Sequence, residues 1–173
     1  MDKSLTEQSN LYTKQLVHKK ILVPFHELQK NVEEMFMNYA DKYIINKCSK
    51  EGYISNKKFN VISYSAGATS ASNIEYDVVF EFHVCLPSEG MIMDCKIESV
   101  TKIGIKAILS HDDKENPVVV FASQLHNPSI FDYEDEDNDS ENKFKEGSLI
   151  KIKVVGHRFE INDPSIYVLG EII

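Results

Sequence analysis

The chain has 173 residues, of which 42% are hydrophobic and 27% charged, and its net charge is −8. This composition is that of an ordinary globular protein and argues against intrinsic disorder over most of the chain. Cys48, Cys85 and Cys95 are far apart, with no CxxC or Cys/His pattern, so neither a disulfide scaffold nor a structural zinc site is expected. No segment has the length and apolarity of a membrane span or a signal peptide, so we expect an intracellular protein with no membrane partner.

The negative charge is concentrated in one stretch of the second half. Residues 1–86 carry ten lysines and ten acidic residues, whereas seven of the later acids lie between Asp132 and Glu141. Without that stretch the rest of the chain has a net charge of only −1. A block of like charges is usually a solvated loop, and the alternative is a segment that contacts a basic partner.

The first half begins with a predicted strand over residues 11–23, where apolar and β-branched residues recur without helical spacing. Pro24 can occupy the first turn of a helix, and an apolar stripe follows it, so we expect an amphipathic helix from about Phe25 to Asp41 that packs on a sheet. The stripe consists of Leu28, Val32, Met35, Phe36, Tyr39 and Tyr43. Residues 57–84 predict a hairpin whose second strand alternates apolar residues with polar ones, placing His83 on the solvent side.

A break in the pattern at residues 85–90 predicts a domain boundary, with one domain over 1–86 and another over 87–173. The second domain contains five predicted short strands, with a long insertion before the fourth: 91–100, 104–109, 118–123, 149–159 and 166–173. Five strands in this order favour a closed β-barrel of the OB type. We therefore expect an α+β protein, in which an antiparallel sheet with one amphipathic helix precedes a five-stranded barrel.

Alternation along the barrel strands predicts which side chains point outward. The residues expected to point inward are Met91, Met93, Cys95, Ile97, Ile103, Ile105, Ala107, Ile150, Ile152 and Val154. The basic residues expected outside, where they could follow a phosphate backbone, are Lys102, Lys106, Lys151, Lys153 and Arg158. Rings that could stack on bases are Phe121, His126 and Phe159. The alternative is that these lysines only keep a small barrel soluble.

Catalytic signatures are missing from the sequence. It contains no phosphate-binding loop, dinucleotide-binding motif, HExxH or nucleophile elbow, and its densest carboxylates lie in the acidic stretch. We expect no catalytic residue, metal or cofactor. An enzyme with an unrecognised site would have to use residues such as His111, Asp112 or Asp113.

Three segments together carry a resemblance to a known family: IEYDVVFEFHVCLPSEGMIMDCKIESVTKIGIKA, PVVVFASQL and IKIKVVGHRFEINDPSIYVLGEI. The chain resembles, over nearly its whole length, the larger stalk subunit of multi-subunit DNA-directed RNA polymerases. This family includes the seventh subunit of the eukaryotic RNA polymerase II and its archaeal counterpart. The Glu89-Gly90 order and the acidic stretch depart from the cellular members. The abundance of lysine, isoleucine and asparagine, with a single arginine, is the bias expected from an A+T-rich genome. Together with this bias, the segment from VISYSAG to TKIGIKA most resembles the versions encoded by large nucleocytoplasmic DNA viruses.

The resemblance implies a non-catalytic subunit made of a tip domain and an S1-type OB barrel. The tip domain would dock on the polymerase core near the clamp, with Gly52, Tyr53 and Gly67 as docking positions, and would pair with a smaller helical stalk subunit. The barrel would contact nascent single-stranded RNA. The protein would then be found in the virion and host cytoplasm if viral, or in the nucleus if cellular and eukaryotic. The alternative is a free-standing S1-type RNA-binding protein of translation or RNA metabolism.

Overall fold

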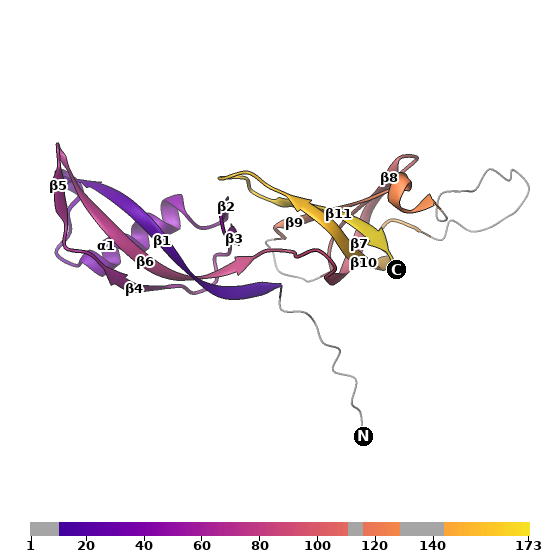
Figure 1. The fold of residues 1–173 in the computed structure, drawn as a ribbon, viewed down its shortest axis with the longest axis horizontal. Helices are drawn as coiled ribbons and strands as arrows, with labels where there is room; N and C mark the ends of the chain where they lie inside the picture. Colours follow the sequence, from indigo (N-terminus) through magenta and orange to yellow (C-terminus); the bar gives the residue numbers. More distant parts are fainter. Residues whose placement is uncertain (1–10, 111–115, 129–143) are drawn as a thin grey trace, which may run out of the picture. The chain divides into compact units, whose positions relative to one another are not determined.

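The computed structural model describes residues 11–110, 116–128 and 144–173 (Figure 1). The described chain is mostly β-structure with one α-helix, and it forms two compact units. One unit holds residues 12–86 together with 160–164, and the other holds the rest of the described chain after residue 86. The acidic stretch Asp132–Glu141 and the residues His111 to Asp113 lie outside the described residues.

The N-terminal unit is built around two long antiparallel strands, β1 (Tyr12–Pro24) and β6 (Asn73–Cys85). They pair over their full length, with Tyr12 opposite Cys85 and Pro24 opposite Asn73. The strand predicted over 11–23 is therefore confirmed as β1. Three short strands pair with the other edge of β6: β5 (Ala68–Ser70), β4 (Asn60–Tyr64) and β3 (Gly52–Ile54). The strand β2 (Lys47–Ser49) pairs with β3.

The helix α1 spans Val32–Tyr43, so the predicted start at Phe25 is wrong. Pro24 instead ends β1, and a single 3-10 turn, η1 (Phe25–Glu27), follows it. The helix begins after Asn31, whose side chain accepts a hydrogen bond from the Glu34 backbone N–H at 3.3 Å. The asparagine satisfies one of the amide groups that a helix start leaves unpaired, which proline cannot do.

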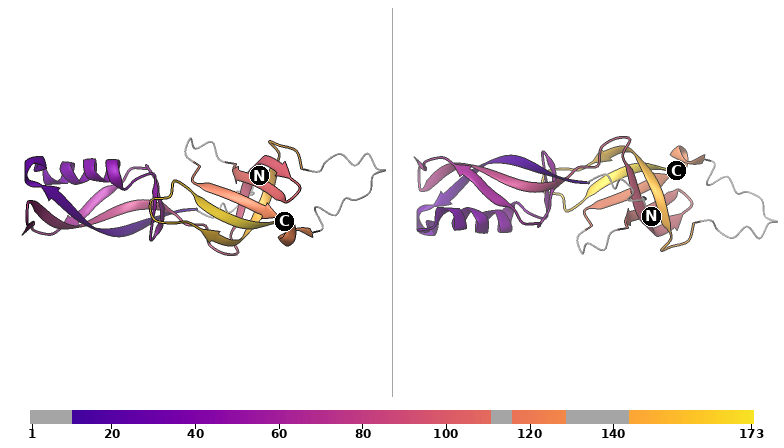
Figure 2. Two further views of the ribbon diagram at one scale, coloured as in Figure 1. Left: turned by 90° about the horizontal axis from the view of Figure 1, so that it is seen from above. Right: turned by 90° about the horizontal axis from the view of Figure 1, so that it is seen from below.

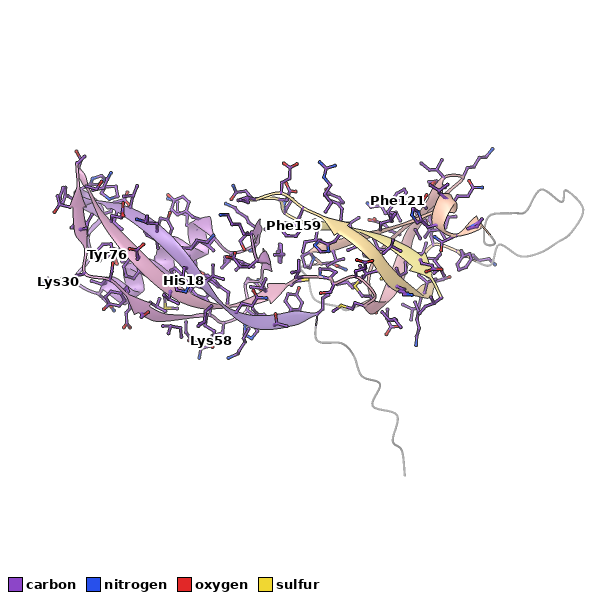
Figure 3. The ribbon with its side chains drawn as sticks, viewed as in Figure 1. His18, Lys30, Lys58, Tyr76, Phe121 and Phe159 are labelled. Atoms are coloured by element: carbon purple, nitrogen blue, oxygen red, sulfur yellow. The ribbon has the colours of Figure 1, made fainter. Side chains whose placement is uncertain are left out.

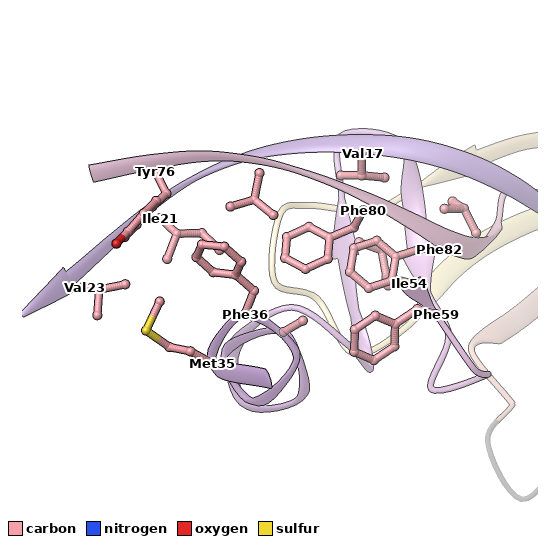
Figure 4. Close-up of a cluster of buried hydrophobic side chains, with 13 residues drawn as sticks. Val17, Ile21, Val23, Met35, Phe36, Ile54, Phe59, Tyr76, Phe80 and Phe82 are labelled. Atoms are coloured by element: carbon pink, nitrogen blue, oxygen red, sulfur yellow. The ribbon is translucent and has the colours of Figure 1, made fainter. Parts of the chain in front are cut away.

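One face of the N-terminal sheet is covered by α1 (Figure 2). Met35 and Phe36 of the helix are buried against β1 and β6 (Figure 4). The Phe36 ring lies edge-on to Tyr64 and Tyr76, with ring centroids 5.3 and 5.1 Å away. Such edge-to-face pairs add to the stabilisation from burial alone. Phe36 is therefore the largest of the buried side chains, with Met35 and Ala40, through which α1 packs on the sheet.

His83 lies on the predicted face of β6, away from the buried residues, but it is less exposed than expected. It is half-buried, and its Nδ1 atom is buried without a hydrogen-bond partner among the described residues. The apolar residues with which it alternates are buried as predicted: Tyr76, Val78, Phe80, Phe82 and Val84.

The second unit is a closed five-stranded barrel with an OB-like arrangement. Its strands are β7 (Ile92–Thr101), β8 (Gly104–Leu109), β9 (Val118–Ser123), β10 (Leu149–Arg158) and β11 (Ile166–Ile172). Neighbours follow the order β7, β8, β9, β11, β10, and β10 returns to β7. Only the β9–β11 pair is parallel. The barrel interior contains most of the residues predicted there: Met93, Cys95, Ile97, Ile105, Ala107, Ile150, Ile152 and Val154.

Two predicted interior residues differ. Ile103 is 70% exposed, so its inward assignment is wrong. It lies in the turn between β7 and β8, and because β8 begins only at Gly104, strand alternation does not extend to it. Met91 lies just before β7 and is half-buried.

Asn127 is a buried polar residue that joins the end of β9 to the end of β11. Its Nδ2 donates to the carbonyl oxygens of Ser123 at 2.9 Å and Gly170 at 3.3 Å, and its Oδ1 accepts from the Ile172 N–H at 2.8 Å. A short 3-10 turn, η2 (Gln124–His126), connects β9 to it. The amide thus satisfies three backbone groups with one side chain.

Replacing Phe36 with alanine should destabilise the N-terminal unit by about 3–5 kcal/mol, because it removes a fully buried ring and leaves a cavity. Urea unfolding followed by circular dichroism measures this change. Met37→Ala, at the neighbouring exposed position of α1, is the control and should change stability by less than about 1 kcal/mol. Equal losses from the two variants would contradict the packing described for Phe36.

Replacing Asn127 with alanine should destabilise the barrel by about 1–3 kcal/mol, because three backbone groups lose their partner. Thermal unfolding of the purified variant tests this. Gln124→Ala, three residues earlier and exposed, serves as the control and should unfold like the wild type. A wild-type melting temperature for Asn127→Ala would show that these hydrogen bonds contribute nothing net.

Candidate nucleic-acid interface

Barrel strands β8, β9 and β11 bring three outward positions into one row. Lys106 on β8 is the register partner of Phe121 on β9, and Phe121 is the register partner of Leu169 on β11. The Phe121 side chain is 39% exposed although its strand neighbours Val120 and Ala122 are fully buried. An aromatic ring therefore stands on the outer surface directly beside a lysine.

A second row runs parallel to the first. Arg158 at the end of β10 is opposite Tyr167 on β11, and Tyr167 is opposite Val119 on β9. Tyr167 is 54% exposed. Since Val119 is two residues from Phe121 on the same strand, the two rings occupy diagonal positions on adjacent strands, within reach of side chains of this length. We call the set Lys106, Phe121, Arg158, Tyr167 and Leu169 the aromatic face.

Tyr167 is a surface ring that the sequence reasoning missed. The signal was present, because Tyr167 lies between two apolar residues that alternation places inside, Ile166 and Val168. Both are buried in the structure. The same argument that placed the lysines outside would have placed this ring outside as well.

The charge of Lys106 is locally balanced. Its Nζ atom lies 2.6 Å from Oε2 of Glu98, and the two side chains are 43% and 46% exposed. The register of β7 against β8 shifts between Ile97 and Ser99, so that Glu98 is the extra residue of a β-bulge beside Lys106. The aromatic face therefore carries less net positive charge than its lysine suggests.

Lys151 and Lys153 lie on a different part of the barrel surface. Both are exposed on β10, where Lys151 is opposite Asp94 and Lys153 is opposite Glu171. On the closed barrel, β7 lies between β10 and β8, and β11 lies between β10 and β9. The predicted basic residues thus do not form one strip, and an acidic residue faces each lysine of β10.

The remaining predicted positions occupy the ends of the barrel. Lys102 lies in the β7–β8 turn. The Gln124 N–H donates to the Ile103 carbonyl at 3.1 Å, which places this turn next to η2 and its exposed His126. The Phe159 ring is stacked on His157, with centroids 5.8 Å apart, and lies away from Phe121 (Figure 3). One side of the Phe159 ring is therefore already covered.

Of the three docking positions, Gly52 and Tyr53 lie in the interior of the N-terminal unit. Tyr53 is 4% exposed, and Gly52 has a positive φ of 125°. A Cβ atom at Gly52 would meet the Cys85 carbonyl oxygen, and one at Gly67 would meet the side chains of Ile74 and Tyr76. At both glycines the absence of a side chain permits close packing within the sheet.

Large exposed apolar side chains occur elsewhere on the N-terminal sheet. Leu16 and Leu22 of β1 are 57% and 51% exposed, whereas Val17, Ile21 and Val23 of the same strand are buried. The two leucines therefore face away from α1. The sequence predicted the strand β1 correctly, but the exposed leucines on its outward face were not predicted as a contact surface.

The three cysteines of the chain are all buried in the structure. Burial raises the pKa of the Cys85 and Cys95 thiols to about 12 and that of Cys48 to about 11, so all three are protonated. Within residues 11–110, 116–128 and 144–173, no group of three or more His, Cys, Asp or Glu is placed to hold a metal ion. The same residues include no helix long and apolar enough to cross a membrane.

Comparison with known proteins adds no assignment: no family model matches the chain, and a search of curated proteins finds no match. The class defined by the structure is thus a mostly β protein of two units, one of them a closed OB-like barrel.

If the aromatic face stacks on bases, Phe121→Ala and Tyr167→Ala should each weaken binding of a fluorescent oligouridine. A stacked base contributes about 1–3 kcal/mol, so the expected loss is at least about fivefold for each variant. Fluorescence anisotropy gives the dissociation constants. Leu149→Ala removes an exposed apolar side chain of β10 without a ring and should bind like the wild type. Wild-type affinity in both ring variants would place any RNA contact elsewhere.

Proposed function

We propose that this protein is the larger, non-catalytic stalk subunit of a DNA-directed RNA polymerase. Its N-terminal unit serves as the tip domain that docks on the polymerase core, near the clamp and the RNA exit path. Its barrel, of the S1 type, contacts nascent RNA. The observation that carries the proposal is the OB-like barrel that follows a separate sheet unit, in the order that the sequence resemblance implies.

The composition of the barrel surface supports the RNA contact. OB barrels commonly bind single strands on their second and third strands, which here are β8 and β9, and in the loops after the first and fourth. Lys106 and Phe121 lie on these two strands, and single-strand binding needs this combination of cation and ring. The aromatic face is therefore the part of the barrel that we assign to RNA.

The loop after the fourth barrel strand, which OB barrels commonly use to bind ligands, is hydrogen-bonded to β2 in this protein. The loop between β10 and β11, Glu160–Pro164, belongs to the N-terminal unit. There the Cys48 N–H donates to the Asp163 carbonyl, and the Asn162 N–H donates to the Cys48 carbonyl, both at 2.8 Å. Since these backbone groups are satisfied by β2, we assign RNA contacts to the β7–β8 turn, which holds Lys102, rather than to this loop.

The exposed leucines of β1 support docking on a large partner. Leu16 and Leu22 lie on the sheet face that α1 leaves uncovered, and ion pairs flank them. Lys14 pairs with Glu81 at 3.0 Å, and Lys20 pairs with Glu75 at 2.6 Å. Apolar side chains between charges that are already paired form a surface that a protein partner could cover at small electrostatic cost. We assign this face to the polymerase core or to the smaller helical stalk subunit.

Affinity purification of the tagged protein from the cells or particles that produce it tests the proposal. We expect the large catalytic polymerase subunits among the co-purifying chains identified by mass spectrometry. A Leu16→Glu/Leu22→Glu variant should lose them, whereas Leu149→Glu on the barrel should retain them. Recovery of ribosomal or translation proteins, or of RNA alone, would instead support a free-standing S1-type RNA-binding protein.

A further inference from the structure

The ion pair between Glu98 and Lys106 engages the ammonium group that lies beside the Phe121 position of the aromatic face. Lys106 is the lysine beside the Phe121 ring, so a base stacked on Phe121 would bring its backbone near this ammonium group. In the structure that ammonium is held by the Glu98 carboxylate at 2.6 Å. A carboxylate and a phosphate use the same donors, and only one of them can take the direct contact.

This pairing is particular to Lys106 among the predicted RNA-binding lysines. Lys102, Lys151 and Lys153 have no carboxylate within ion-pair distance in the part of the chain that the structure describes. Because Ile97 is opposite Ala107, an unbroken register would place Glu98 opposite Lys106. At the bulge Ser99 takes that position instead, and the Glu98 carboxylate still reaches the Lys106 ammonium. Alternation with the buried residues Ile97 and Ala107 places both side chains on the outer surface of the barrel.

We infer that Glu98 is an intramolecular competitor of the RNA phosphate, which holds Lys106 in the RNA-free protein and is displaced when RNA binds. The inference rests on the proposed RNA contact of the aromatic face. On this inference, the Glu98 carboxylate lowers the affinity for RNA and reduces the salt dependence of binding. The exposed position of both side chains lets the exchange proceed without any movement of the backbone.

The salt dependence follows from counting charges. Each lysine that neutralises a phosphate of a single strand steepens the slope of log K against log salt by about 0.7. When Lys106 leaves Glu98 for a phosphate, the carboxylate becomes unpaired and attracts a cation in turn. The counterion released from RNA is then offset by the one taken up at Glu98. Lys106 therefore contributes little to the salt slope of the wild-type protein.

Substituting Glu98→Gln removes the competing charge and keeps the size of the side chain. An oligouridine of about 12 nucleotides, within the site sizes that OB folds cover, is a suitable fluorescent probe. We expect the variant to bind it about fivefold more tightly at low salt, the scale set by an exposed ion pair. We also expect a slope of log K against log salt that is steeper by about 0.7. Glu89→Gln removes the same charge at an exposed position before β7 and is the matched control.

A Lys106→Gln substitution in both backgrounds completes the test. It should weaken binding little in the wild type, and it should abolish the gain in affinity and slope in the Glu98→Gln protein. Equal shifts in affinity and slope for Glu98→Gln and Glu89→Gln would overturn the competition. So would an equal effect of Lys106→Gln in the wild type and in the Glu98→Gln protein. In both cases the RNA contact itself would stand. If none of the proteins binds the probe, the RNA contact and the competition are both overturned.

Discussion

The candidate interface exists because the barrel is closed. Strand β10 pairs with β7 on one side and with β11 on the other, so the sheet has no free edge. Outside the bulges of β7 and β10, its residues alternate between the interior and the outer surface. The interior is filled closely enough that a Cβ atom at Gly170 would meet the Ile152 side chain. Because the neighbouring positions must point inward, the ring of Phe121 and the ammonium of Lys106 must point outward. The aromatic face is thus a consequence of how the core is packed.

The N-terminal unit is an open sheet with α1 packed on one of its two faces (Figure 2). A single helix of 12 residues covers one face of its sheet, and the strands β1 and β6 pair over 13 residues each. The opposite face keeps Leu16 and Leu22 exposed between satisfied ion pairs. The unit also incorporates the β10–β11 loop through the backbone of Cys48. The division of labour that we propose, docking by the sheet and RNA contact by the barrel, follows from these two different surfaces.

Local charge has more influence on the candidate interface than net charge. The chain as a whole is at −8, yet much of that charge lies in the Asp132–Glu141 stretch. On the barrel, an acidic residue faces each of the lysines on β10, and Glu98 holds Lys106. A count of outward lysines therefore overstates the positive potential. At the 2.6 Å between their charged atoms, the Glu98 carboxylate largely cancels the field of the Lys106 ammonium group.

Local patterns were enough to place the strands of the barrel nearly to the residue, since alternation and the punctuation by Gly, Pro and Asn are local signals. They also placed Val32, Met35, Phe36 and Tyr39 on the packed face of α1, but Leu28 of the predicted stripe precedes the helix and Tyr43 at its end is exposed. The start of the helix was not found, because Pro24 was compatible with either a strand end or a helix start and only the Asn31 cap distinguished them. The three-residue strands β2, β3 and β5 were missed because they are too short to show a period. The tertiary structure was needed to show which outward residues are neighbours, and that Glu98 reaches Lys106. Strand order, register and bulges arise from contacts between residues distant in the chain, which no local pattern encodes.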